Sequence, residues 1–158
     1  MDICLQNLNE SQQEAVCCTK GPLLILAGAG SGKTKVITHR IAYLISAKSV
    51  PPWEILALTF TNKAAQELQS RVEQQVGSIR GMWVSTFHSA AVRILREHAF
   101  RLGYKATFVI YDSADQLNVV KNVMKNLNMD DSQYKPRGLL SAISRAKNEL
   151  IDVDLYSE

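Results

Sequence analysis

Short apolar runs alternate with amphipathic stretches through the first two thirds of the chain. The runs are LLILA (23–27), ILALTF (55–60) and MWVSTF (82–87), and each has the length and content of a buried strand. The stretches that follow them have apolar residues at helical spacing and cover about 32–47, 62–76 and 88–103. Continuous apolar strands that alternate with helices predict an α/β fold, with a parallel sheet flanked by helices.

From Asp112 onward the pattern becomes helical. Apolar residues recur at helical spacing within 112–131, and the stretch 135–152 predicts a further helix with a proline near its start. We therefore divide the chain into an α/β part, residues 1–111, and a mostly α-helical part, residues 112–158. The second part stops at DLYSE without an obvious closing element, so we expect it to be the beginning of a larger subdomain.

Composition excludes several classes of protein. The 158 residues are enough for one domain with a core. No apolar run approaches the roughly 20 residues that span a bilayer, and the N-terminus lacks the basic start and apolar centre of a secretory signal. Cys4, Cys17 and Cys18 lack the spacing of a zinc site or a disulfide framework. These features predict a cytoplasmic protein without a membrane span.

Basic residues gather in the middle of the chain. Residues 61–105 contain seven Lys and Arg against three Asp and Glu, whereas residues 106–158 contain six against eight. The middle third is therefore the expected place for a polyanion. Solvated helix faces would give the same counts, so charge alone leaves both interpretations open.

The segment AGAGSGKT lies between the first apolar run and the first predicted helix. It matches the pattern G-x-x-x-x-G-K-[ST] except at its first position, where alanine replaces glycine. Glycines let backbone N–H groups turn toward an anion, the lysine reaches β- and γ-phosphates, and the threonine hydroxyl is a ligand for Mg²⁺. The predicted nucleoside triphosphate site consists of Ala27, Gly28, Ala29, Gly30, Ser31, Gly32, Lys33 and Thr34.

Hydrolysis also needs a carboxylate that holds Mg²⁺ at the end of a neighbouring strand. The stretch FVIYD offers Asp112 for this role, with Asp115 three residues later. The same spacing suits Asp112 or Ser113 as the cap of the following helix. From the residues alone, both interpretations stay open.

Three further stretches accompany the phosphate loop: LNESQQEAV (8–16), TFTNKAA (59–65) and STFHSAAVRILR (85–96). Together with AGAGSGKT, in this order and spacing, they resemble the N-terminal part of the UvrD/Rep/PcrA-type superfamily 1 DNA helicases. The resemblance covers essentially the whole chain, because IYDSADQL and ISRAKNEL resemble the opening of that family's helical insertion. It implies an incomplete RecA-like P-loop NTPase subdomain over 1–111 and the start of the insertion over 112–158.

The resemblance also assigns roles around the nucleotide. Gln12 matches the glutamine whose amide reads the adenine edge, which makes ATP with Mg²⁺ the implied ligand. Lys33 and Thr34 match the catalytic pair of the phosphate loop, with Thr34 on the metal. Lys35 stands where family members commonly have an arginine near the base, and a lysine lacks the planar fork of that side chain. An exposed helical glutamine is the alternative for Gln12.

Single-stranded DNA is the second implied ligand. TFTNKAA resembles a motif on the DNA track: Thr59, Thr61 and Asn62 would bind phosphates, Lys63 would add charge and Phe60 would stack on a base. STFHS resembles a second such motif and implies Thr86 and His88 near the DNA backbone. The structural alternatives place Phe60 in the core and make Asn62 a helix N-cap.

The implied parent is an ATP-dependent helicase that moves 3′ to 5′ on single-stranded DNA, engages single-strand/duplex junctions and serves DNA repair or replication. In this family the magnesium-binding acids follow the helical insertion, so the resemblance makes Asp112 a cap and implies an N-terminal fragment that binds nucleotide without efficient hydrolysis. Two alternatives stay open. A self-contained P-loop ATPase or kinase would use Asp112 for Mg²⁺, and a non-catalytic nucleic-acid-binding module would have no need of Lys33 and Thr34.

Overall fold

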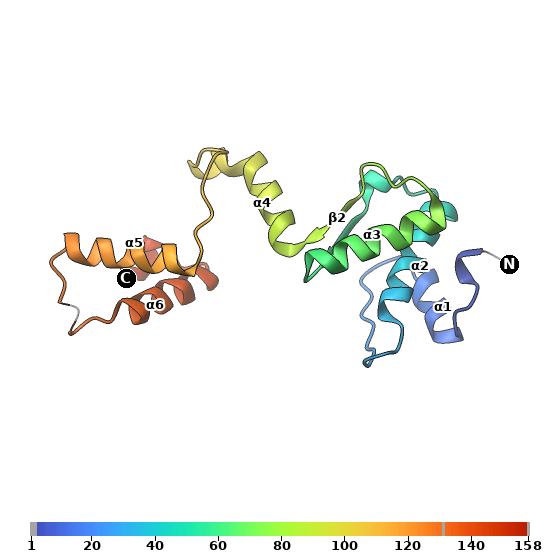
Figure 1. Ribbon diagram of the computed structural model, residues 1–158, viewed down its shortest axis with the longest axis horizontal. Helices are drawn as coiled ribbons and strands as arrows, with labels where there is room; N and C mark the ends of the chain where they lie inside the picture. Colours follow the sequence, from blue (N-terminus) through green and yellow to red (C-terminus); the bar gives the residue numbers. More distant parts are fainter. Residues whose placement is uncertain (1–2, 131, 158) are drawn as a thin grey trace. The chain divides into compact units, whose positions relative to one another are not determined.

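The structure is a computed structural model that describes residues 3–130 and 132–157 (Figure 1). The chain divides into two compact units, Met1–Ala106 and Thr107–Glu158. In chain order the elements are η1 (Ile3–Leu5), α1 (Glu10–Cys17), α2 (Lys33–Ser46), η2 (Pro52–Glu54), β1 (Leu56–Thr59), α3 (Asn62–Val76), β2 (Trp83–Thr86), α4 (Phe87–His98), η3 (Ala99–Leu102), α5 (Ser113–Asn126), α6 (Pro136–Asn148) and α7 (Val153–Ser157). The first unit therefore holds a small sheet with its helices, and the second is built from helices.

A two-stranded parallel sheet forms the centre of the first unit. β1 pairs with β2 from Leu56 opposite Trp83 to Thr59 opposite Thr86, and α3 connects the two strands. The strands predicted over 55–60 and 82–87 are confirmed, each somewhat shorter than its apolar run. The observed architecture is thus a mostly helical α/β arrangement with two parallel strands.

The core of this unit lies between the strands, α2 and α3. α3 buries one stripe of its surface, because its apolar residues recur every three or four positions. Burying a side chain such as Leu68 stabilises the fold by about 1.5–3 kcal/mol. The buried members of this core are Ile41, Ile55, Ala57, Leu68, Val72 and Ile79.

The first predicted strand, LLILA, is not found as a strand. Residues 23–27 have no regular secondary structure, and the side chains of Leu24 and Leu26 are 82% and 88% exposed. A strand exists only through ladder hydrogen bonds to a neighbour, and in the described residues the sheet consists of β1 and β2 alone. The apolar run has strand composition but no partner, which is the physical reason for this correction.

The N-terminal segment packs on α2 beside the sheet. α1 and α2 lie side by side (Figure 1), and Leu8, Val16 and Val36 form a small buried cluster between them. Asn9 caps α1 in a reciprocal arrangement: its side chain accepts from the amide of Gln12, and the side chain of Gln12 accepts from the amide of Asn9. This capping box fixes Gln12 at the start of α1.

In the second unit, α5 and α6 lie side by side (Figure 1), with Met124 buried. After α5, the carboxylate of Asp130 accepts hydrogen bonds from the Ser132 hydroxyl at 2.7 Å and the Ser132 amide at 2.8 Å. Hydrogen bonds to the ionised form lower the pKa of Asp130 below its usual value. The assignment of residues 112–158 to a helical insertion stays a prediction.

No helix within 3–130 and 132–157 combines the length and the apolar character needed to cross a membrane.

Candidate nucleotide and nucleic-acid site

The phosphate loop connects the irregular apolar segment to α2. Gly30 and Gly32 have φ angles of +76° and +84°, in the left-handed region that glycine tolerates best. The Ser31 hydroxyl donates to the carbonyl of Gly28 at 2.7 Å and tightens the turn. Gly32 is the N-cap of α2 and provides no side-chain cap. The backbone amides in the first turn of α2 therefore have no capping side chain as an acceptor. Such amides can donate to a bound anion.

Lys33 lies across this loop. Its Nζ donates to the carbonyl oxygens of Ala27 at 3.0 Å and Gly28 at 2.6 Å. The ammonium group thus binds two main-chain carbonyl oxygens at the start of the loop. Thr34 follows in the first turn of α2 and is exposed. A cation and a hydroxyl at the start of one helix can together contact a phosphate group and its bound metal.

Gln12 reaches the loop from α1. Its Nε2 donates to the carbonyl of Ser31 at 3.1 Å, and its Oε1 accepts from the amide of Asn9 at 3.1 Å. The structure therefore brings Gln12 to a loop that is 19 residues away in the sequence.

Three basic side chains of α2 tie the N-terminal segment to this helix. Lys35 donates to the carbonyl of Asn7, Nδ1 of His39 donates to the carbonyl of Cys4 at 2.8 Å, and Arg40 donates to the carbonyl of Ala15 at 2.7 Å. Lys35, expected near the base, is thus directed at the main chain of the N-terminal segment in this structure.

The second group of expected site residues lies at the carboxyl ends of β1 and β2. Phe60 follows Thr59, and Phe87 follows the paired residue Thr86. The two rings lie with their centroids 5.7 Å apart and tilted by 53°, which is a favourable aromatic geometry. Phe60 is 92% exposed and Phe87 52% exposed. The alternative that Phe60 belongs to the core is therefore wrong for this structure.

Threonines cap both helices that leave this edge. Thr61 caps α3, with its Oγ1 accepting from the amide of Ala64 at 3.1 Å. Asn62 is the first residue of α3, so the expectation that it is the N-cap is wrong. Thr61 is the N-cap, because its backbone is extended and its hydroxyl accepts from an amide in the first turn of α3.

Thr86 caps α4 and is only 8% exposed. Its Oγ1 accepts from the amide of Ser89 at 3.2 Å and donates to the Ser89 hydroxyl at 2.9 Å. Lys63 and His88 are exposed in the first turns of α3 and α4. The edge thus presents two rings, a cation and an imidazole, whereas Thr86 is buried.

Asp112 caps α5. Its Oδ1 accepts from the amides of Ala114 and Asp115, both at 2.8 Å, and the side chain of Asp115 accepts from the amide of Asp112 in return. The preceding residues 108–111 are not in a strand. The local geometry is that of a helix cap, without the strand that a magnesium-binding acid of this class requires.

Comparison with known proteins places these features in one family. The family described as the UvrD/REP helicase N-terminal domain matches residues 8–158. The chain belongs to the UvrD/Rep helicase family. It is 54% identical over 155 residues to the ATP-dependent DNA helicase PcrA of Bacillus subtilis, covering 98% of this chain and 21% of that protein. It is also 54% identical over 151 residues to the PcrA proteins of Staphylococcus epidermidis and Staphylococcus aureus, covering 95% of this chain and 21% of each.

The chain thus spans about a fifth of the length of these helicases of the UvrD/Rep family. The family resemblance seen in the sequence is confirmed. The roles of individual residues, by contrast, stay predictions, for which the structure gives only positions and contacts.

Sequence reasoning missed Phe87 in this UvrD/Rep chain. The signal that could have found it is the repeat of Thr-Phe at the ends of the two strands, at 59–60 and 86–87. Parallel strands in register place equivalent residues at the same edge, so the two rings could be expected to lie close together. Sequence reasoning also missed that Arg93 lies over the ring of Trp83, with 3.9 Å between the guanidinium carbon and the ring centroid.

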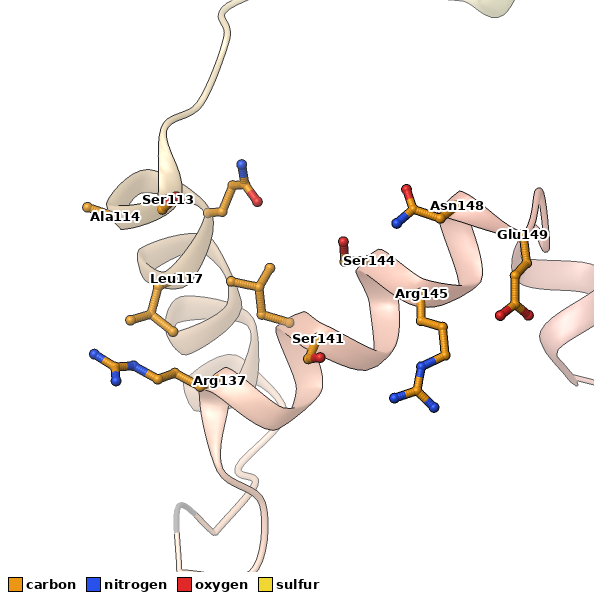
Figure 2. A pocket seen from close by; sticks show the side chains of 11 residues that line it. Ser113, Ala114, Leu117, Arg137, Ser141, Ser144, Arg145, Asn148 and Glu149 are labelled. Carbon is orange, nitrogen blue, oxygen red and sulfur yellow. The ribbon is translucent and has the colours of Figure 1, made fainter. Parts of the chain in front are cut away.

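A separate hollow of this UvrD/Rep chain lies in the second unit, between α5 and α6. This open groove of about 980 Å³ has polar side chains along one face of α6 and Leu117 from α5 (Figure 2). Figure 2 shows Arg137, Ser141 and Arg145 following one another along the helix. None of the predicted nucleotide or DNA residues lines the groove.

Proposed function

We propose that this chain is the ATP- and single-stranded-DNA-binding part of an ATP-dependent helicase that moves 3′ to 5′ and engages single-strand/duplex junctions in DNA repair or replication. The observation that carries the proposal is the phosphate loop, with Lys33 across it and Gln12 against it. Membership of the UvrD/Rep family and similarity to proteins named ATP-dependent DNA helicase PcrA support the same function.

Nucleotide binding follows from the groups that line the loop. Lys33 exchanges the carbonyls of Ala27 and Gly28 for phosphate oxygens, since a charged acceptor binds an ammonium group more strongly than a neutral carbonyl. The amides at the start of α2 then donate to the same phosphates. The amide of Gln12, which donates to the Ser31 carbonyl of the loop, would also meet the edge of the base.

Magnesium fits this site in part. Bound Mg²⁺ would neutralise phosphate charge and orient the terminal phosphate. Of the predicted residues, Thr34 supplies one hydroxyl oxygen, and magnesium commonly completes its shell with waters and phosphate oxygens. The part of the chain that the structure describes contains no cluster of three or more His, Cys, Asp and Glu side chains that could hold a metal. We propose that the chain binds MgATP without efficient hydrolysis, and that Asp112 acts as a cap.

Single-stranded DNA would lie on the carboxyl edge of β1 and β2. Phe60 provides an exposed face on which a base stacks, and stacking tolerates any sequence because every base has a π-face. Lys63 and His88, exposed in the first turns of the helices that follow β1 and β2, would contact the backbone phosphates. The hydroxyl of Thr59 donates to the carbonyl of Thr61 at 3.0 Å in this structure and would turn toward a phosphate when DNA binds.

In the parent protein, ATP binding would close two motor domains and ADP release would open them. DNA held at the edge of β1 and β2 would then advance when the domains close, because α2, which starts at the phosphate loop, packs into the same core as β1. This coupling is the function that residues 8–158 would contribute to the whole helicase.

The test measures binding and turnover of MgATP by the 158-residue chain, with and without single-stranded DNA, beside Lys33→Ala. The proposal expects ATP binding that Lys33→Ala weakens at least tenfold, the effect of losing about 1.4 kcal/mol or more, and no turnover in either condition. Turnover that depends on Lys33 would show that the chain carries its own catalytic acid. ATP binding unaffected by the substitution would refute the nucleotide site.

A further inference from the structure

Gln12 is bonded at both ends of its side-chain amide. Its Oε1 accepts a hydrogen bond from the backbone amide of Asn9, and its Nε2 donates one to the carbonyl of Ser31, each at 3.1 Å. A carboxamide has two N–H donors and two acceptor lone pairs. These two bonds use one N–H donor and one lone pair. The second donor and the second lone pair remain for hydrogen bonds to a base edge, and neither existing bond has to break.

The amide also lies in close contact with the last glycine of the loop. A Cβ built on Gly32 would stand 3.0 Å from Nε2 of Gln12, which is tighter than nine in ten real Cβ contacts. Gln12 thus contacts two successive loop residues, at the point where the left-handed Gly32 starts α2. The capping box holds the other end of the side chain to the start of α1.

We propose that Gln12 is a positioning residue for the phosphate loop, acting through the Ser31 carbonyl, in addition to any contact with the base. The inference rests on the proposed nucleotide site and deepens it. A loop with two residues at positive φ has many alternative conformations, since glycine restricts the backbone least. One hydrogen bond from a side chain fixed on α1 to the Ser31 carbonyl holds the loop in one of these conformations.

Loop positioning and base reading predict different effects of a substitution on the affinities for ATP and GTP. A residue that only reads adenine changes the affinity for ATP and leaves GTP unaffected. A residue that holds the loop lowers the affinity for GTP as well as for ATP, because both carry the same triphosphate. A neutral hydrogen bond of this kind corresponds to about a three- to tenfold change in affinity.

The experiment compares Gln12→Met with Gln13→Met in the full 158-residue chain. Gln13 is the matched control, because its Nε2 donates to the carbonyl of Leu8 at 3.0 Å instead of the loop. Backbone order parameters of Gly30 and Ser31 are measured by NMR without ligand, and MgATP and MgGTP affinities are measured by titration.

Gln12→Met should lower the order parameters from about 0.85, the value of rigid backbone, toward about 0.6. It should also weaken both nucleotides about three- to tenfold, while Gln13→Met changes neither quantity. Unchanged order parameters, or a loss of affinity confined to ATP, would overturn the proposal. If the wild-type chain bound neither nucleotide, the proposed function would fail, and the order parameters would still decide the role of Gln12.

Asn9→Ala separates this role from simple stabilisation of α1. The substitution removes the bond from the amide of Gln12 to Oδ1 of Asn9, which weakens the helix start, but it leaves the main-chain amide that holds Oε1 of Gln12. We expect the loop order parameters of Asn9→Ala to stay at the wild-type value. A loss equal to that of Gln12→Met would assign the effect to α1 and overturn the positioning role.

Discussion

Replacing Phe60 by alanine removes a ring that is 92% exposed and contacts Phe87 at a centroid distance of 5.7 Å. Stacking of one base on an aromatic side chain contributes about 1–3 kcal/mol by alanine substitution. The dissociation constant for single-stranded DNA should therefore rise about 5- to 150-fold. Because so little of Phe60 is buried, this loss should come with little change in the free energy of unfolding.

Phe87 should act through Phe60. An aromatic pair in this geometry contributes about 0.5–1.5 kcal/mol beyond its buried area, so Phe87→Leu, which keeps an apolar side chain, should weaken DNA binding about 2- to 13-fold. The same substitution should have almost no effect when Phe60 is already alanine. The two rings should thus show a coupling energy of the same size in a double-mutant cycle.

Fluorescence anisotropy with a labelled oligothymidylate at one fixed salt concentration measures DNA binding by the wild-type chain, the two single variants and the double variant. Phe100→Ala is the control, since Phe100 is 69% exposed but belongs to η3, away from the two strand ends. DNA affinity that is unaltered by Phe60→Ala would refute stacking at this edge. An equal effect of Phe87→Leu with and without Phe60 would refute the coupling between the rings.

Three further predictions concern stability and ionisation. Thr61→Ala should reduce the free energy of unfolding, measured by urea denaturation, by about 1 kcal/mol, because the α3 cap is lost. Asn62→Ala, outside that cap, should reduce it less. A larger loss for Asn62→Ala would contradict the assignment of Thr61 as the N-cap. Leu24→Ala should change it by less than about 0.5 kcal/mol, whereas a loss of about 2 kcal/mol would indicate a buried strand. In an NMR titration, Asp130 should have a pKa below its usual value. Its hydrogen bonds therefore stabilise the fold at pH values above the usual pKa, and this stabilisation is lost as the pH falls. Ser132→Ala should raise the pKa of Asp130, and an unchanged pKa would exclude the Ser132 hydroxyl as a cause.

Much of the fold could be predicted because the signals are local. The run 55–60 became β1, and the sequence 62–76 became α3 with the same bounds. Asp112 could be recognised as a possible cap because an N-cap and its partner lie three residues apart. Each of these features depends on neighbours within a few positions.

Features that depend on distant partners were harder to predict. LLILA has the composition of a strand, but ladder bonds require a neighbour, and composition says nothing about whether that neighbour is present. The contact of Gln12 with Ser31 spans 19 residues, and no periodicity connects them. The family resemblance identified Gln12 as a site residue without indicating that its amide would hold the loop.

Side-chain donors on α2 meet main-chain acceptors throughout the N-terminal segment. Lys35, His39 and Arg40 all donate to carbonyl oxygens of residues 4–15. A carbonyl oxygen is present at every residue type, so substitutions among the acceptor positions leave these bonds intact as long as the backbone keeps its path. The two segments should therefore differ in their tolerance of mutation. The N-terminal segment can change in sequence and stay attached, whereas few other residue types can replace each side-chain donor on α2. Random mutagenesis of both segments, scored by folding, would show this difference as unequal tolerance.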